Sequence, residues 1–100
     1  MSLKDKIQTA IESGQKVLVD YYRDSCPPCK GLAMQLAKVE QNNPDILIVK
    51  IKANSSEEET EMFQSKNIQS VPQLFFYQNG KEIAHMTGAT PYSKIIDVFS

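Results

Sequence analysis

The chain contains two cysteines, Cys26 and Cys29, and only two prolines separate them. A Cys-x-x-Cys pair that follows an apolar run and precedes a helical pattern is typical of a thiol–disulfide redox site. At the start of a helix, unpaired backbone N–H groups and the positive end of the helix dipole favour the thiolate form of a cysteine. We therefore predict that Cys26 attacks a disulfide and that Cys29, one turn later, resolves the mixed disulfide.

A stabilising disulfide and a metal site are the other roles that such a pair can have. A disulfide that closes so short a loop removes little entropy from the unfolded chain, so it would stabilise the fold weakly. Zinc needs four ligands, whereas this chain has two Cys and a single His, so we expect no metal and no bound cofactor. We expect His85, the single histidine, to be an exposed structural residue in an edge strand.

The two prolines between the cysteines act on the redox pair in opposite ways. They remove two N–H donors near the thiolate, and they also stiffen the turn. The sequence therefore leaves open whether they raise or lower the reduction potential.

Asp20 is a charged residue inside the apolar run 16–22. One interpretation is a carboxylate at the strand end that faces water. The other is a buried acid, which is costly and is more often found at functional sites. Lys50 has two interpretations as well, because it either lies near Asp20 or alternates with Lys52 on a solvent-exposed face.

Length and composition limit the classes of protein to which the chain can belong. One hundred residues with 41% hydrophobic side chains predict a single domain, residues 1–100, with one compact core. A net charge of −1 argues against a nucleic-acid partner, and no apolar stretch approaches the ~20 residues that cross a bilayer. The first six residues lack the apolar segment of a secretory signal, so we predict a cytoplasmic protein, in which such a pair is more often catalytic than structural.

The helices and strands predicted around these residues follow the order α-β-α-β-α-β-β-α. Helices are expected over residues 4–13, 30–41, 57–66 and from 91 onward, and strands over 16–22, 46–49, 74–77 and 82–84. The two apolar runs 16–22 and 46–49 predict buried parallel strands joined by a helix. Asn79-Gly80 predicts a type I′ hairpin turn. Thr90 and Pro91 are predicted to be the N-cap and first residue of the last helix.

Three segments of the chain resemble the thioredoxin family. They are VLVDYY (17–22) leading into CPPCK (26–30), then SVPQLF (70–75), and NGK (79–81) followed by TGA (87–89). The resemblance implies a three-layer α/β thioredoxin fold, in which a four-stranded mixed sheet is flanked by helices and the usual N-terminal strand is absent. It also implies protein-disulfide reductase activity and a cis peptide bond before Pro72.

The chain departs from the usual family pattern next to the cysteines. Ser25 replaces a tryptophan, Pro27 replaces a glycine, and Met34 replaces the proline that kinks the active-site helix. We expect these three replacements to affect substrate preference and redox potential.

The resemblance also assigns roles to residues outside the cysteine pair. Asp20 would be a buried acid beneath Cys29 that exchanges protons with the resolving thiol, with Lys50 as possible support. Pro72 would face the cysteines, and the backbone N–H and C=O of Val71 would pair with an extended substrate peptide. Gly88 would belong to the flat surface where substrates dock.

The predicted function is that of a monomeric thiol–disulfide oxidoreductase that reduces disulfide-containing proteins and receives electrons from a thioredoxin-reductase-type donor. One alternative is a disulfide oxidant or isomerase. A second is a non-catalytic binding module that uses the surface between Val71 and Gly88. The enzyme is favoured by the joint presence of Cys26, Cys29, Asp20 and Pro72. A protein that only binds a partner needs no proton relay.

Overall fold

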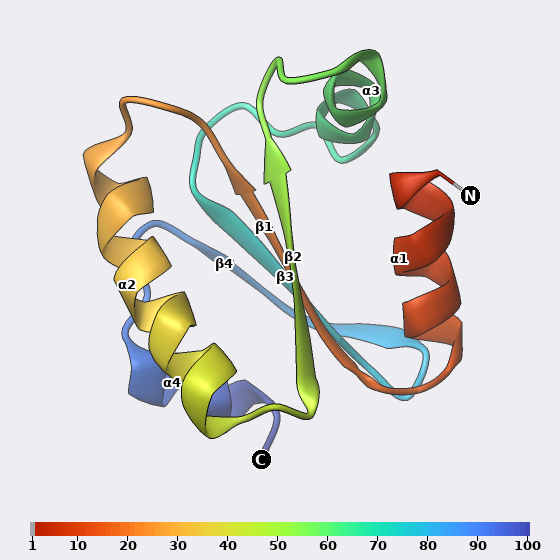
Figure 1. Cartoon of the computed structure of the whole chain (residues 1–100), viewed down its shortest axis with the longest axis vertical. Coiled ribbons are helices and arrows are strands. Elements are labelled where there is room, and N and C mark those ends of the chain that lie inside the picture. The colour runs from red at the N-terminus through yellow and green to blue at the C-terminus, as the bar shows by residue number, and fades with distance from the viewer. Residues whose placement is uncertain (1) are drawn as a thin grey trace.

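The computed structural model describes residues 2–100, and in this range four strands form one mixed sheet that lies between two pairs of helices (Figure 1). The elements in chain order are α1 (Leu3–Glu12), β1 (Lys16–Tyr22), α2 (Pro27–Asn42), β2 (Ile46–Lys52), α3 (Glu57–Ser65), β3 (Gln73–Gln78), β4 (Lys81–Thr87) and α4 (Tyr92–Val98). This is the predicted three-layer α/β architecture with a four-stranded mixed sheet, so the predicted fold class is confirmed.

The strands are arranged in the order β2-β1-β3-β4. β1 pairs in parallel with β2 and antiparallel with β3, and β3 pairs antiparallel with β4. The predicted parallel β-α-β unit is therefore confirmed. The hairpin between β3 and β4 turns at Asn79 and Gly80, both of which have positive φ angles (57° and 81°), as a type I′ turn requires.

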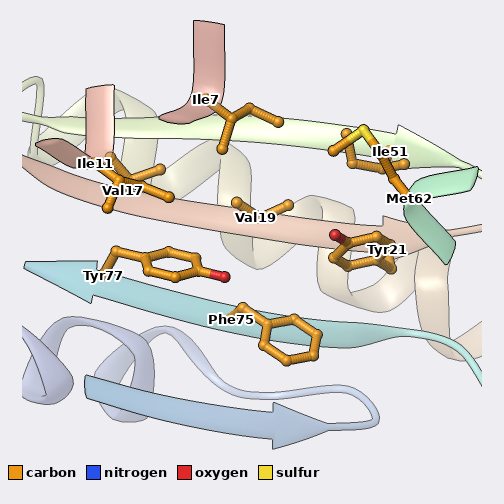
Figure 2. Close-up of a cluster of buried hydrophobic side chains, with 9 residues drawn as sticks. All are labelled: Ile7, Ile11, Val17, Val19, Tyr21, Ile51, Met62, Phe75 and Tyr77. Atoms are coloured by element: carbon orange, nitrogen blue, oxygen red, sulfur yellow. The ribbon is translucent and has the colours of Figure 1, made fainter. Parts of the chain in front are cut away.

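Alternation along β1 divides the core into two layers. Val17, Val19 and Tyr21 pack toward α1 and α3, where Figure 2 shows them beneath side chains from both helices. Leu18 packs toward α2 and α4. Because side chains alternate between the faces of a strand, Asp20 lies on the same face as Leu18, beneath α2.

β2 is not covered in the way that the sequence predicts. It extends to Lys52, and it lies at an edge of the sheet, where Leu47 is 38% exposed while Ile51 is fully buried. The prediction of a fully buried strand was wrong for β2 because hydrophobicity along a single strand does not reveal which strand becomes the edge.

The first residues of α2 and α4 also differ from the prediction. α2 begins at Pro27, because proline is tolerated in the first turn, where its missing N–H has no helical partner. The N-cap of α4 is Pro91 rather than Thr90. Thr90 is buried, and its hydroxyl donates to the carbonyl oxygen of Gly88 at 3.1 Å, so the predicted cap was wrong.

We expect Leu36→Ala to lower the free energy of unfolding by about 2–5 kcal/mol, because Leu36 is fully buried between α2 and the sheet and its truncation leaves a cavity. Chemical denaturation measures the effect. Met34→Ala is the matched control on the same helix: Met34 is 69% exposed, so its change should remain within about 0.5 kcal/mol. Equal effects of the two substitutions would contradict the described packing of α2.

Candidate active site

Cys26 and Cys29 form a disulfide at the start of α2, with their Cα atoms 5.2 Å apart. Cys26 is the N-cap of the helix, and its Sγ accepts a hydrogen bond from the backbone N–H of Cys29 at 3.3 Å. Pro27 and Pro28 have no N–H, so the amide of Cys29 is the first one available in the helix. One backbone donor thus remains directed at the Cys26 sulfur, where it would stabilise a thiolate after reduction.

Solvent exposure does not distinguish the two sulfurs, because Cys26 is 3% exposed and Cys29 is 6% exposed. The helix geometry does distinguish them. Cys26 occupies the N-cap position and receives the amide hydrogen bond, whereas Cys29 lies inside the first turn. This difference favours Cys26 as the attacking sulfur and Cys29 as the resolving one.

The segment before β3 lies beside the cysteine pair. The carbonyl oxygen of Val71 is 4.0 Å from the Sγ of Cys26, and the peptide bond between Val71 and Pro72 is cis. Pro72 is fully buried, and its carbonyl oxygen accepts from the backbone N–H of Gly88 at 3.0 Å. The structure therefore brings the three residues predicted to bind substrate together on one side of the disulfide.

Asp20 is buried, with 3% of its surface exposed, and it lies on the face covered by the helix that carries both cysteines. Its Oδ1 has no hydrogen-bond partner within residues 2–100. Burial raises the pKa of Asp20 from 3.8 to about 6, and the positive charge of Lys50 acts in the opposite direction. Lys50 is its register partner on β2 and has an exposed side chain.

Comparison with known proteins agrees with this geometry. A family model described as Thioredoxin matches residues 2–100. The chain belongs to the thioredoxin family. Thioredoxin-2 of Saccharomyces cerevisiae is 33% identical over 84 residues, which cover 83% of this chain and 78% of the relative. A thioredoxin of Mycoplasma genitalium is 29% identical over 99 residues, which cover 99% and 93% of the two chains.

A solved structure supports the same assignment. The crystal structure of Chlamydomonas reinhardtii thioredoxin f2 superposes with a TM-score of 0.74 at 33% identity, covering 96% of this chain and 88% of that one. Family membership and the closely placed cysteine pair identify this thioredoxin-family protein as a thiol–disulfide oxidoreductase.

Sequence reasoning did not single out Gln73, the first residue of β3. Its buried side-chain amide donates to the carbonyl oxygen of Ser70 at 2.8 Å, and its Oε1 lies 2.8 Å from Nε2 of His85. His85 is exposed on the edge strand β4, as predicted, but its contact with Gln73 was not foreseen. The available signal was a polar residue at the start of an apolar run, directly after Val71-Pro72.

A second unforeseen contact is the ion pair between Lys52 and Asp24, with 2.9 Å between Nζ and Oδ2. Asp24 lies in the loop between β1 and Cys26, so the pair connects this loop to the end of β2. Alternation along β2 indicates an exposed lysine but does not reveal its partner.

Neither a metal cluster nor a membrane span is found in the described part of the chain. Across residues 2–100, no group of three or more His, Cys, Asp or Glu side chains is arranged to bind a metal ion. No helix in the same range is long and apolar enough to cross a membrane.

We expect Asp20→Asn to change how stability depends on pH. The folded-state pKa of Asp20, about 6, lies above the ordinary value of 3.8, so its carboxyl ionises less readily in the folded protein. The wild-type free energy of unfolding therefore falls as the pH rises from 3.8 to about 6 and then levels off. Asparagine cannot ionise, so relative to wild type the variant should gain about 2 kcal/mol between pH 4 and pH 8.

Denaturant melts of both proteins across this pH range measure the difference. Asp97→Asn, at an exposed position on α4, is the matched control and should follow the wild-type profile. Parallel profiles for wild type and Asp20→Asn would mean that the Asp20 carboxyl is solvated.

Proposed function

We propose that this protein reduces disulfide bonds in other proteins, with Cys26 as the attacking thiol and Cys29 as the resolving thiol. The observation that carries the proposal is the position of the pair: a cysteine at the N-cap of a 16-residue helix, with an amide directed at its sulfur and the Val71 backbone beside it. Family membership supports the same chemistry.

The reaction transfers two electrons from the cysteine pair to the substrate. The thiolate of Cys26 attacks one sulfur of the substrate disulfide, forms a mixed disulfide and releases the other substrate sulfur as a thiolate. The thiol of Cys29 then loses its proton and attacks the Cys26 sulfur. This step forms the Cys26–Cys29 disulfide, which is the state that the structure shows, and releases the second substrate thiolate.

Asp20 is the proposed acceptor for the proton of Cys29. It lies beneath the same helix, it is buried, and its Oδ1 is free of other hydrogen bonds among the described residues. A pKa of about 6 leaves its carboxylate mostly ionised at pH 7, so it can take the proton when Cys29 attacks and return it when the disulfide is next reduced. Lys50, exposed opposite Asp20, would support this relay through its charge.

The proposed substrate site is the backbone of Val71 together with Pro72 and Gly88. An extended peptide could pair with the N–H and C=O of Val71 in the manner of an added strand, which would bring its cysteine to Cys26. A groove of about 360 Å³ adjoins Val71 and would accept a neighbouring side chain of the peptide. Its other lining residues are Arg23, Ala53, Asn54, Phe63, Ile68, Gln69 and Ser70.

The proposed cycle needs an electron donor that reduces the Cys26–Cys29 disulfide after each turnover. A thioredoxin-reductase-type enzyme is the donor that family membership suggests. We further propose that the protein acts as a monomer in the cytoplasm, where the surrounding thiols keep such a pair reduced. Equilibration of the cysteine pair with a series of glutathione redox buffers measures its reduction potential. This value distinguishes a disulfide reductant from the alternative, a disulfide oxidant or isomerase.

Substitution of each cysteine tests the assignment of roles. With dithiothreitol as electron source, Cys26→Ser should lose more than 99% of the reduction of a protein disulfide, which is a loss of about 10²-fold or more, because no nucleophile remains at the helix start. Cys29→Ser should instead accumulate mixed disulfides with the substrate, which mass spectrometry detects. Full activity of Cys26→Ser would refute the proposed function.

Replacement of Asp20 tests the proposed proton transfer. Asp20→Asn should slow resolution of the mixed disulfide by about 10²-fold or more at pH 7, because a positioned general base typically contributes about 10²–10⁴-fold. Single-turnover rates of both proteins from pH 5 to pH 9 measure the effect, with Asp97→Asn as control. Equal rates for wild type and Asp20→Asn would show that Asp20 has no part in the exchange.

A further inference from the structure

The side chain of Gln73 holds the backbone next to the proposed substrate site. Gln73 is 9% exposed, and its Nε2 donates to the carbonyl oxygen of Ser70 at 2.8 Å and lies 3.5 Å from the Ser70 hydroxyl. Ser70 directly precedes Val71, whose carbonyl oxygen lies 4.0 Å from the sulfur of Cys26. One buried amide is therefore connected through two backbone residues to the reacting sulfur.

This hydrogen bond matters because the backbone of residues 69–71 has little other support. On the N-terminal side, the N–H of Ile68 donates to the carbonyl of Phe63. On the C-terminal side, the carbonyl of Pro72 accepts from Gly88. Among the described residues, 2–100, the backbone of residues 69–71 has two contacts of this kind with the protein. The Gln73 amide donates a hydrogen bond to the Ser70 carbonyl, and the Cys26 sulfur lies against the Val71 carbonyl.

His85 orients the Gln73 amide. Because the Gln73 Nε2 donates to Ser70, its Oε1 faces His85 and can only accept, so the Nε2 of His85 carries the hydrogen of this 2.8 Å contact. The imidazole ring is itself held in place, since it stacks on Phe75 with the ring centroids 4.2 Å apart and an interplanar angle of 11°. His85 and Phe75 are register partners across β3 and β4, which places both rings on the same face of the sheet.

We propose that Gln73 and His85 are positioning residues that determine how well this protein binds an extended disulfide substrate. Gln73 fixes the Ser70 carbonyl, so that Val71 presents its backbone N–H and C=O in one orientation beside Cys26, and His85 keeps the Gln73 amide turned toward Ser70. This inference rests on the proposed function, since it concerns the backbone with which the substrate peptide pairs.

Such a role affects binding of a peptide but not the exchange reaction between sulfurs. A small disulfide has no peptide backbone to pair with Val71, so its reaction with Cys26 should not depend on Gln73 or His85. A purely structural role would instead lower the melting temperature and affect both kinds of substrate equally. The ratio of the two rates therefore distinguishes positioning from general stabilisation.

The test uses the reduced 100-residue chain and two matched disulfides. One is an extended peptide whose single cysteine forms a mixed disulfide with 2-mercaptoethanol, and the other is the disulfide of 2-mercaptoethanol itself. Each is mixed with wild type, Gln73→Met and His85→Phe, and the second-order rate constants are measured. Methionine keeps the length of Gln73 without its hydrogen bonds, and phenylalanine keeps the stacking on Phe75 without the donor.

In Gln73→Met, the ratio of the peptide rate to the small-disulfide rate should fall about fivefold to tenfold, which corresponds to the loss of one hydrogen bond. His85→Phe should lower the same ratio by about twofold to fivefold, since it removes only the bond that orients the amide. Gln78→Met, at the opposite end of β3, is the matched control and should leave the ratio unchanged.

The outcomes separate this inference from the proposed function. A wild-type protein that reduces neither disulfide would overturn both. Reduction of both disulfides with an unchanged ratio in a folded Gln73→Met would overturn the positioning role alone. If Gln73→Met does not fold, the test relies on His85→Phe, because His85 is exposed and phenylalanine keeps the ring that stacks on Phe75. An unchanged rate ratio in His85→Phe would overturn the proposed role of His85 and, with it, the positioning role of both residues.

Discussion

The burial and pairing of the central strand β1 fix where the cysteines and their neighbours lie. It is hydrogen-bonded to β2 on one side and to β3 on the other, and apolar side chains cover both of its faces. The chain can leave such a strand only at its end, where it turns through Ser25, whose φ is 55°, into Cys26. The redox pair therefore lies between the carboxyl end of a buried strand and the start of a helix. These two rigid elements hold the pair in place.

The same constraint explains why an acid is buried on the sheet face that α2 covers. Alternation along β1 directs the side chain of Asp20 toward α2, away from water, and burial raises its pKa to about 6. Such an arrangement lowers stability at neutral pH compared with a neutral residue. An uncharged side chain of similar shape could pack in this space, and the cost of burying the acid is one observation that supports the proposed proton transfer.

The substrate side of the site is built in a different way. Cys26 is positioned by a helix terminus, whereas the neighbouring residues 69–71 lie between α3 and β3 and lack ladder hydrogen bonds. A side-chain network compensates for this, since the buried Gln73 binds the Ser70 carbonyl and the exposed His85 binds Gln73. The proposed thiol chemistry and the proposed peptide binding therefore depend on separate parts of the fold.

Patterns in the amino-acid sequence were enough to predict features that depend on neighbours close along the chain. The order of elements, the Asn79-Gly80 turn and the cysteine pair at a helix start follow from local patterns, and the resemblance to thioredoxins added the cis bond before Pro72. Only the tertiary structure decided which strand became the exposed edge, that Thr90 bonds to Gly88 instead of capping α4, and that His85, Gln73 and Ser70 form one network. The edge and the His85 contact depend on how strands pair across the sheet, whereas Thr90 and Gln73 bond to carbonyls two and three residues away. No local pattern of hydrophobicity or turn residues specifies such a choice of partner.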